Sequence, residues 1–252
     1  MMDILISLIA VVLAITLHEA AHGYAALALG DDTAKKLGRL SLNPLAHVDR
    51  VGTLIVPGIL VIGQLLMMGR IGFLFGWAKP VPVAAWRFRN PRQGMALVAA
   101  AGPAANFALA WLGGLALQAV ALPDWVACYG FEVQQLQNAC LALSMDDPAD
   151  PAGRFLHMFI LSNLVLGLFN LLPIPPLDGG RIMVGVLPEG LARTWAGLER
   201  AGIVLVLLLV FLLPMAAREF GYQFDPVGAA LDQVLPWAIR MVLLASGHGG
   251  DV

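Results

Sequence analysis

The chain has 252 residues, of which 59% are hydrophobic and 13% charged, and its formal net charge at pH 7 is −2. With a mean hydropathy of +0.80, this composition excludes a soluble globular domain and predicts a polytopic membrane protein. The small net charge and the lack of a basic cluster interleaved with aromatic residues give no reason to expect nucleic acid as a partner.

The first predicted element is an apolar helix over residues 4–29. It opens with Met-Met-Asp and lacks the basic segment of a secretory signal, so we expect it to be retained. Such a helix is about 39 Å long and can cross a hydrocarbon core of about 30 Å. It contains the sequence HEAAH at residues 18–22. Because polar groups at this depth are costly in lipid, they indicate a functional site.

The next segment, 51–76, is apolar but interrupted by Pro57 and several glycines. We expect a re-entrant hairpin that turns near Gly69, and a sixth full span is the alternative. Partly alternating stretches at 38–43 and 77–83 predict two short β-strands at the cytoplasmic face, the second suited to a sheet edge by its prolines. The cytoplasmic assignment rests on the basic residues of this region, which are Lys35, Lys36, Arg39, Arg50, Arg70, Lys79, Arg87, Arg89 and Arg92.

Four further apolar runs predict membrane helices near residues 94–122, 155–173, 201–217 and 227–245. The loop 123–153 carries acidic residues and no Lys or Arg, which places it on the outer side, and 178–200 returns to the cytoplasm with three arginines. Cys128 and Cys140 lie in the outer loop, where a disulfide and free thiols are both compatible with the sequence. The predicted fold class is an all-α polytopic membrane protein with five to six transmembrane helices, a re-entrant hairpin and short cytoplasmic-face β-strands.

The HEAAH sequence has the spacing of a zinc site. Residues four apart return to one helix face, so His18 and His22 can present ring nitrogens to the same ion. Glu19 lies on the same side, close enough to reach a metal-bound water without being a ligand. The metal would lower the pKa of that water towards 7, and the glutamate would take its proton. The alternatives are a chance pentapeptide or polar side chains that join helices through hydrogen bonds.

A catalytic zinc needs a third protein ligand, and Asp178 is the candidate. It follows the stretch NLLPIPPL, whose prolines forbid a regular helix where the chain reaches the cytoplasmic level. We therefore expect Asp178 on irregular backbone at about the depth of His18 and His22. Taken alone, the Asp-Gly pair is better explained as a turn that caps the next helix.

Taken together, HExxH on a first membrane helix and N-x-x-P-x-P-x-L-D-G on a later one resemble the site-2 protease family of intramembrane zinc metalloproteases. A third family feature, G-P-x-x-N, matches Gly102 to Asn106, and the resemblance covers about residues 15–185. The segments NPLAHVD at 43–49 and WAKPVP at 77–82 are similar to the compact branch of that family. Unlike its larger members, the chain is expected to have no insert long enough for a PDZ domain and no terminal regulatory domain.

The resemblance implies specific roles for individual residues. One Zn²⁺ per chain would be held by the family's three ligand positions, which fall on His18, His22 and Asp178. The catalytic base falls on Glu19. Asn106 and Asn170 become tentative substrate-binding or oxyanion-stabilising residues, with hydrogen bonding between helices as the alternative. His47 and Asp49 could form a second metal pair, although a simple His-Asp contact is favoured because three ligands already complete the site.

The predicted function is an intramembrane zinc metalloendopeptidase that cleaves transmembrane segments, in regulated intramembrane proteolysis or in clearance of membrane peptides. A substrate helix must unwind before its carbonyls become accessible, and an edge strand at 77–83 could hold it by β-addition. We expect one domain over 1–252, with a catalytic core at about 1–185 and C-terminal helices at about 200–245. The expected location is a bacterial inner membrane, with the active site towards the cytoplasm, and the expected partners are lipid and substrate helices. The oligomeric state stays open.

Two other functions fit part of the sequence. A non-catalytic membrane protein that binds or translocates zinc would use the same three ligands but would give Glu19 no role. A membrane zincin acting on soluble or prenylated substrates would be expected to take its third ligand from a glutamate on a later helix. The later glutamates lie in loops or beside them, and they are Glu189, Glu199 and Glu219.

Overall fold

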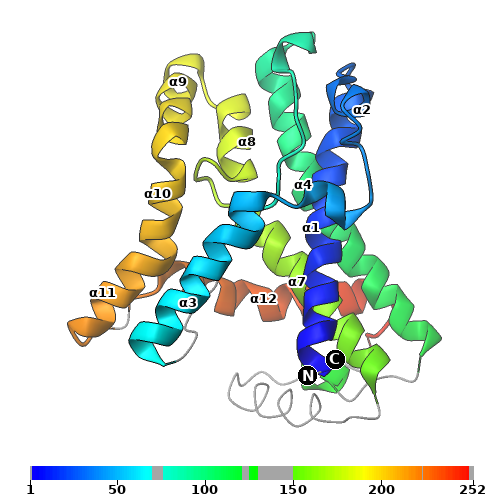
Figure 1. Cartoon of the computed structure of the whole chain (residues 1–252). Helices are drawn as coiled ribbons and strands as arrows, with labels where there is room; N and C mark the ends of the chain where they lie inside the picture. Colours follow the sequence, from blue (N-terminus) through cyan, green and yellow to red (C-terminus); the bar gives the residue numbers. More distant parts are fainter. Residues whose placement is uncertain (1, 70–75, 121–124, 130–149, 223, 250–252) are drawn as a thin grey trace.

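The computed structural model describes residues 2–69, 76–120, 125–129, 150–222 and 224–249 (Figure 1). Within these ranges five helices are long and apolar enough to cross a membrane, and they run over Leu5–Ala28, Pro91–Ala119, Pro151–Asn170, Gly202–Glu219 and Pro226–Ala245. All regular elements of the described residues are helical. The chain is therefore an integral multi-pass membrane protein of helical architecture.

The centre of the molecule is built from three helices, α1 (Met2–Ala28), α4 (Pro91–Ala116) and α7 (Pro151–Asn170). Helix α4 packs against both others and against α8 (Asp178–Val186), while α1 also packs against α7. In Figure 1 the last helix, α12 (Pro226–Ala245), runs across the direction of α1. This central packing places the HEAAH helix and α8 against the same helix, α4.

A buried apolar cluster joins α4, α7 and α12 in the half of the molecule away from HEAAH. Its largest fully buried members are Leu117, Ile160, Leu164, Ile239 and Leu243. Small residues allow the close approach of these helices, because a Cβ added at Gly113 would lie 2.9 Å from Ile160 Cγ1.

Three of the long helices begin in the same way. The caps of α4, α7 and α12 are Asn90, Asp150 and Asp225, and each side chain accepts a hydrogen bond from the backbone N–H three residues later. A proline follows each cap, where its missing N–H costs nothing. Local sequence signals therefore determine where these helices start.

The remaining elements are short or discontinuous. They are α2 (Thr33–Lys36), η1 (Pro44–His47), η2 (Arg50–Ile55), α3 (Val56–Met68), η3 (Ala85–Arg87), η4 (Leu117–Ala119), α5 (Trp125–Cys128), α9 (Glu189–Gly197), η5 (Leu198–Ala201), α10 (Gly202–Leu207), η6 (Leu208–Leu212) and α11 (Leu213–Glu219). The π-helical η6 joins α10 and α11 into one long segment, which corresponds to the fourth candidate span.

The segment 51–76 leaves the HEAAH region and returns to it. Its first arm is the continuous helical run of η2 and α3, which ends at Gly69 with a φ of 67°, a left-handed conformation suited to glycine. Residues 70–75, which follow the turn predicted near Gly69, lie outside the described residues. Trp77 N–H donates to Gly52 O at 3.1 Å, and Thr53 Oγ1 donates to Trp77 O at 2.9 Å. The two ends of the segment are thus hydrogen-bonded to each other.

The predicted β-strands at 38–43 and 77–83 are wrong, because both stretches are irregular and no strand occurs among the described residues. In the second stretch Pro80 and Pro82 have no N–H to donate. The alternating N–H groups are occupied elsewhere: Lys79 N–H donates to His47 O and Val81 N–H donates to Glu19 Oε2. Neither edge of this segment therefore presents a row of donors to a neighbouring strand.

Candidate metal centre and active site

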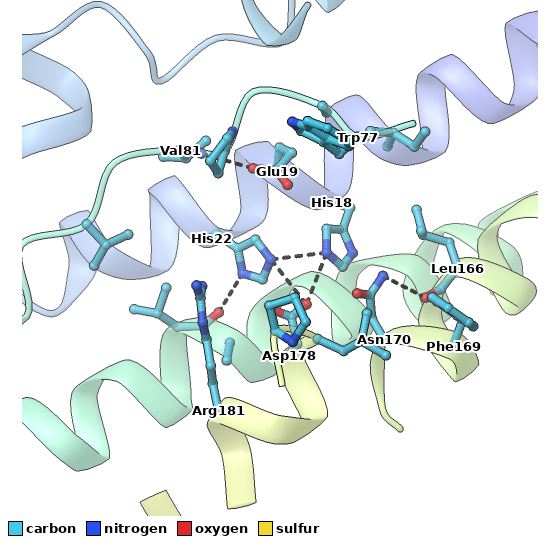
Figure 2. A pocket seen from close by; sticks show the side chains of 18 of the residues that line it. His18, Glu19, His22, Trp77, Val81, Leu166, Phe169, Asn170, Asp178 and Arg181 are labelled. Atoms are coloured by element: carbon cyan, nitrogen blue, oxygen red, sulfur yellow. Dashed lines mark hydrogen bonds and ion pairs between the residues drawn. The ribbon is translucent and has the colours of Figure 1, made fainter. Parts of the chain in front are cut away.

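Helix α1 carries His18 and His22 on one face, and the start of α8 carries Asp178 opposite them (Figure 2). His18 Nε2 lies 3.1 Å from His22 Nε2 and 3.1 Å from Asp178 Oδ2, and His22 Nε2 lies 3.3 Å from the same oxygen. Of the described residues, these three form the group whose ligand atoms could hold a metal ion. The structure therefore brings together the three ligands that the sequence predicted, across 156 residues of chain from His22 to Asp178.

Two glycines allow Asp178 to reach this position. The proline-rich stretch before α8 folds back over the first turn of the helix, so a Cβ at Gly179 would lie 2.3 Å from Leu171 O. A Cβ at Gly180 would lie 2.4 Å from Pro175 N. Both substitutions would meet backbone atoms, which cannot rotate away, so the Asp-Gly-Gly sequence is needed for close packing rather than for a surface turn.

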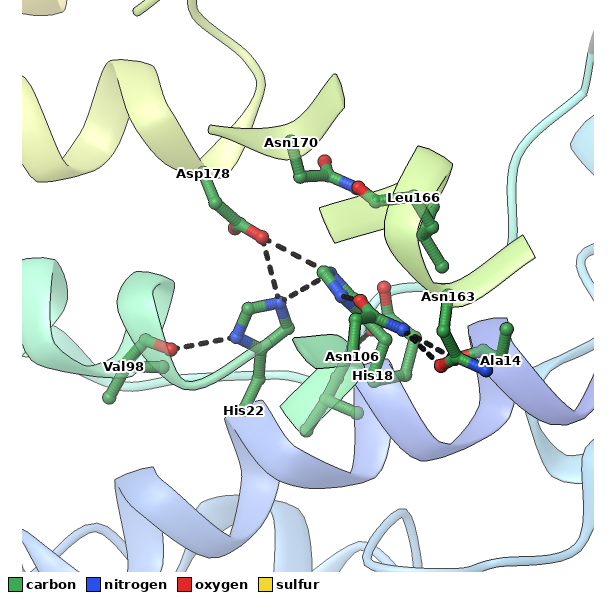
Figure 3. Close-up of polar contacts among 11 residues, drawn as sticks. Ala14, His18, His22, Val98, Asn106, Asn163, Leu166, Asn170 and Asp178 are labelled. Atoms are coloured by element: carbon green, nitrogen blue, oxygen red, sulfur yellow. Dashed lines mark hydrogen bonds and ion pairs between the residues drawn. The ribbon is translucent and has the colours of Figure 1, made fainter. Parts of the chain in front are cut away.

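The protonation of the two imidazoles favours a cation between them. His22 Nδ1 lies 2.7 Å from Val98 O, and His18 Nδ1 lies 2.6 Å from Asn106 Oδ1 (Figure 3). Since both partners are oxygens that can only accept, each Nδ1 carries the proton, and each Nε2 presents a lone pair to the cluster. Asp178 Oδ2 is a buried oxygen that receives no hydrogen bond from the described residues. Three electron-pair donors thus converge without a proton between them.

The dimensions of the cluster fit zinc. Bonds of about 2.0–2.1 Å in a tetrahedral site place neighbouring ligand atoms about 3.3–3.4 Å apart. The three separations, 3.1, 3.1 and 3.3 Å, lie close to this value. Three protein ligands also leave one coordination position open, which is the arrangement of a catalytic rather than a structural zinc site. The residues present therefore suit this ion in number, chemistry and spacing.

Gly102 of α4 forms the floor of the cluster. A Cβ at this position would lie 2.5 Å from His18 Cε1 and 2.6 Å from His22 Nε2. The backbone of α4 therefore lies directly against both imidazoles, and any side chain here would displace them. The G-P-x-x-N motif named this glycine without a role, and the structure shows that it lies against both histidines.

A cavity of about 420 Å³ opens beside the cluster, lined by α1, α4, α7, α8, α10 and the segment before η3. Figure 2 shows Glu19 and Asp178 on opposite sides of the two imidazoles. Glu19 lines this cavity, and its Oε2 accepts a hydrogen bond of 3.0 Å from Val81 N–H. The carboxylate is thus near the cluster without being one of its three ligands.

The two asparagines predicted to bind substrate or stabilise the oxyanion, Asn106 and Asn170, lie in different surroundings. Asn170 lines the cavity, and its Nδ2 donates to Leu166 O of its own helix at 3.0 Å. Asn106 is 0% exposed and lies beneath His18. Its amide therefore contacts a ligand histidine, and Asn170 is the one whose position suits contact with a substrate.

His47 and Asp49 form neither a metal pair nor the expected contact in the described structure. The Nε2–H of buried His47 donates to Ser41 O at 2.8 Å. Asp49 Oδ1 instead accepts from the backbone N–H groups of Val51 and Gly52 and caps η2. The favoured His-Asp contact was wrong because the first turn of a helix offers Asp49 better donors.

Asn163 and the Val98 carbonyl are contacts of the site that sequence reasoning missed. Asn163 is 0% exposed and accepts a hydrogen bond from Asn106 (Figure 3). Its presence within an apolar run was a signal that could have identified it, because buried amides in membrane helices are rare and usually paired. The sequence gives no such signal for the Val98 carbonyl, because every residue has a backbone carbonyl and the residue type does not show which one accepts a hydrogen bond.

Two features lie away from the cluster. Cys128 is disulfide-bonded, and Cys140 lies outside the described residues. His248 is buried near the C-terminal end of α12, with Nδ1 at 3.3 Å from Ser246 Oγ.

Comparison with known proteins supports the chemistry of the site. The profile of Peptidase family M50 matches residues 6–215. The chain is 39% identical over 209 residues to "Putative zinc metalloprotease YwhC" of Bacillus subtilis (strain 168), covering 83% of this chain and 81% of that protein. It is 29% identical over 212 residues to "Putative zinc metalloprotease Rip2" of Mycolicibacterium smegmatis (strain ATCC 700084 / mc(2)155), covering 82% and 67%.

A shorter match, 31% identical over 86 residues, links the chain to "Probable protease eep" of Enterococcus faecalis (strain ATCC 700802 / V583), over 33% of this chain and 20% of that protein. No solved structure matches the chain. The named relatives favour a protease over a zinc-binding or zinc-translocating protein without catalytic activity.

Proposed function

Because the chain belongs to peptidase family M50, the site-2 protease family of membrane zinc metalloproteases, we propose that it cleaves transmembrane segments of other membrane proteins. The observation that carries this proposal is the position of the His18, His22 and Asp178 cluster. It borders a cavity lined in part by four candidate membrane helices, and Glu19 lines the same cavity. A substrate helix that packs among those helices would bring its peptide bonds close to this cluster.

The roles proposed for the residues follow from their positions. His18, His22 and Asp178 would hold one zinc ion per chain. When bound, zinc supplies Lewis-acid activation of water and of the peptide carbonyl. Glu19, held by Val81 N–H, takes the proton from the attacking water as general base and later donates it to the leaving amine. Asn170 faces the cavity and is placed to hydrogen-bond the substrate backbone.

A transmembrane helix is the substrate class that this cavity suits. Its wall is mostly apolar, with contributions from Ile15, Met95, Leu166 and Val206. A helix hides its carbonyls in intrachain hydrogen bonds, so the substrate must unwind locally before the cluster can reach one. We propose either regulated intramembrane proteolysis or clearance of membrane peptides as the biological role, with the lipid bilayer as the medium.

The proposed location is a bacterial inner membrane with the site towards the cytoplasm. This orientation is supported by basic residues that follow α1 and precede α4, among them Lys35, Lys36, Arg87 and Arg89. The acidic loop 123–153 would then lie outside.

The proposal is tested with two variants, one that removes the proposed general base and one that removes a proposed metal ligand. Glu19→Gln keeps size and hydrogen bonding but removes the base, so the purified protein should retain about one zinc while cleavage of a transmembrane substrate falls by about 10²-fold or more. Asp178→Asn should lose both zinc and activity, because a two-ligand site binds far more weakly. Metal content by atomic emission and cleavage of a reconstituted substrate in liposomes are the measurements.

His248→Gln is the matched control, because it alters a buried histidine far from the cluster and should change neither measurement. Unchanged cleavage by Glu19→Gln would overturn the proposed mechanism. Unchanged zinc content in Asp178→Asn would remove this residue from the site.

A further inference from the structure

A chain of buried amides runs from His18 through α4 into α7 (Figure 3). His18 Nδ1–H donates to Asn106 Oδ1 at 2.6 Å. Asn106 Nδ2 donates to Asn163 Oδ1 at 2.9 Å and, at the longer distance of 3.4 Å, to Ala14 O of α1. Asn163 Nδ2 donates in turn to Phe159 O at 2.8 Å. Both asparagines are 0% exposed, so water cannot substitute for any member of this relay.

The direction of every hydrogen bond in the relay is determined at its far end. Phe159 O is a backbone carbonyl and can only accept, so Asn163 must turn its NH₂ towards it. The Asn163 oxygen then faces Asn106 and can only accept, which turns the Asn106 NH₂ towards α7 and the Asn106 oxygen towards His18. An oxygen at that place requires the proton of His18 on Nδ1 and leaves Nε2 unprotonated.

The two ligand histidines differ in this respect. The Nδ1–H of His22 donates to Val98 O, a backbone carbonyl that cannot reverse its polarity. The acceptor of His18 is a side-chain amide, which could rotate and present nitrogen instead of oxygen. His18 therefore needs a second group to keep Asn106 in the productive orientation.

We propose that Asn163 is a positioning residue for the metal centre, which sets the orientation of Asn106 and thereby keeps His18 Nε2 available as a ligand. This inference rests on the proposed zinc site. Without the Asn163 oxygen, the Asn106 NH₂ keeps only its longer contact to Ala14 O, at 3.4 Å, and the amide can turn its nitrogen to His18 Nδ1. The imidazole proton then moves to Nε2, where it faces Asp178 at 3.1 Å and must be displaced before zinc can bind.

The test measures the affinity of the purified, metal-stripped protein for Zn²⁺ by competition with a chromogenic chelator. Asn163→Leu, which removes the amide at similar volume, should weaken affinity by about 10-fold or more, as losing a hydrogen bond behind a ligand histidine does. Asn163→Asp should stay within about threefold of the parent protein, because a carboxyl oxygen accepts from Asn106 Nδ2 in either protonation state. The absorption spectrum of bound Co²⁺ should change in Asn163→Leu and return to the parent form in Asn163→Asp.

A double variant distinguishes an effect of Asn163 on the orientation of the Asn106 amide from an effect on the packing of the helices. In Asn106→Asp the oxygen that faces His18 accepts, and the second oxygen can carry a proton towards Asn163 Oδ1, so the proton stays on His18 Nδ1 whatever lies behind it. Adding Asn163→Leu to this background should therefore change zinc affinity by less than about twofold, and this loss of coupling is what a double-mutant cycle detects. Asn170→Leu on the same helix α7 is the control for affinity, because Asn170 Nδ2 donates to Leu166 O of its own helix rather than to Asn106.

Two results would overturn the inference: parent-like zinc affinity in Asn163→Leu, or an equal loss in Asn163→Leu with and without Asn106→Asp. The second would assign Asn163 to packing alone. If Asn163→Leu does not yield folded protein, the comparison of Asn163→Asp with the parent decides, because a loss beyond threefold in the folded Asp variant contradicts the proposal. Failure of the proposed function is a separate outcome, recognised when the parent protein itself binds no zinc or when Glu19→Gln retains full activity.

Discussion

Three polar side chains of the site, His18, Glu19 and His22, each form a hydrogen bond with a neighbouring part of the protein and direct their remaining polar atom at the site. His22 contacts the Val98 carbonyl, His18 contacts Asn106, and Glu19 contacts the Val81 amide. Polar groups buried among apolar helices are tolerated only when their hydrogen-bonding capacity is met. The contacts behind the site therefore lower the cost of burial and also orient the atoms that would bind zinc or move a proton.

At the scale of single residues, Gly102→Ala should abolish zinc binding and activity. The added methyl carbon would lie 2.5 Å from carbon atoms of both imidazoles, so the histidines or α4 must move, and displacing a ligand by even about 1 Å breaks a zinc bond. We expect zinc content below one tenth of the parent value. Gly63→Ala is the control, because nothing lies within 4 Å of its added carbon. Normal metal content in Gly102→Ala would contradict this prediction, because it would mean that α1 and α4 can move apart without loss of the metal site.

Asp31 is a second residue whose burial depends on its partners. Its carboxylate accepts hydrogen bonds from Thr33 N–H at 3.0 Å and Ala84 N–H at 2.6 Å, joining the end of α1 to the segment before η3. Burial by itself would raise the pKa of Asp31, but these hydrogen bonds, with the Arg87 guanidinium nearby, hold the pKa below its ordinary value of 3.8.

Asp31→Asn should therefore lower the free energy of unfolding by about 2 kcal/mol at pH 7, since bonds to a charged group are replaced by weaker ones. A lowered pKa in the folded state stabilises above the ordinary pKa, and this stabilisation is lost as the pH falls through the lowered value. The difference between parent and variant should be full at pH 7 and shrink below about pH 4 in thermal unfolding. Asp32→Asn, at a half-buried neighbour whose partners Lys36 and Arg87 are solvent-accessible, should change the midpoint less. A difference that stays constant down to pH 3 would contradict this account.

At the scale of elements, the irregular segment 76–84 connects the hairpin to the active site. Trp77 returns the chain to Gly52, Val81 contacts Glu19, and Ala84 contacts Asp31. The segment thus lies against α1, and two of its backbone N–H groups donate to the carboxylates of Glu19 and Asp31. Its prolines suit this role because they stiffen the backbone and leave only selected N–H groups to donate.

Val81→Pro should reduce proteolysis by about 10-fold or more while zinc content stays near that of the parent. Proline has no N–H, so Glu19 loses the donor that orients it, and misplaced catalytic groups lower rates steeply. Val81→Ala keeps the N–H and should retain most of the activity in the same liposome assay. If both variants lose activity equally, the side chain of Val81 matters and its N–H does not.

At the scale of the whole molecule, the C-terminal helices take part in the site. Ile203 and Val206 of α10 line the cavity, and a Cβ at Gly202 would lie 2.4 Å from Pro175 O in the loop before Asp178. The family match likewise extends to residue 215, beyond the core of about 1–185 that the motifs had suggested. The division into a catalytic core and separate C-terminal helices stays a prediction, but α10 packs directly on the loop before Asp178.

The topology makes a prediction for labelling from the two sides of the membrane. Single cysteines at Lys36 and Arg89, in a background without Cys128 and Cys140, should react with an impermeant thiol reagent only from the cytoplasmic side. A cysteine at Asp147 should react only from outside. Both inner positions follow from a segment 51–76 whose ends are bonded to each other at Gly52 and Trp77. Labelling of the Arg89 position from outside would instead support six full spans.

Helices and ligand types were predictable from the sequence because they depend on local information. Apolar length identifies a membrane helix, and the spacing of His18 and His22 follows from 3.6 residues per turn. The link to Asp178 came from a family resemblance, and its meeting with the histidines needed the packing of α1 and α8 on α4.

Tertiary structure decided the features that depend on partners distant in the chain. Asn106 meets His18 across 88 residues and Asn163 across 57, so a motif could name Asn106 without showing that it lies behind a ligand. The expected strand at 38–43 failed for a local reason, since the Gly38 and Arg39 N–H groups donate to Lys35 O and Ala34 O. The expected strand at 77–83 failed because of distant partners. Alternation of side chains predicts a strand only while the backbone N–H groups are free to pair, and Glu19 and the His47 carbonyl occupy those of Val81 and Lys79.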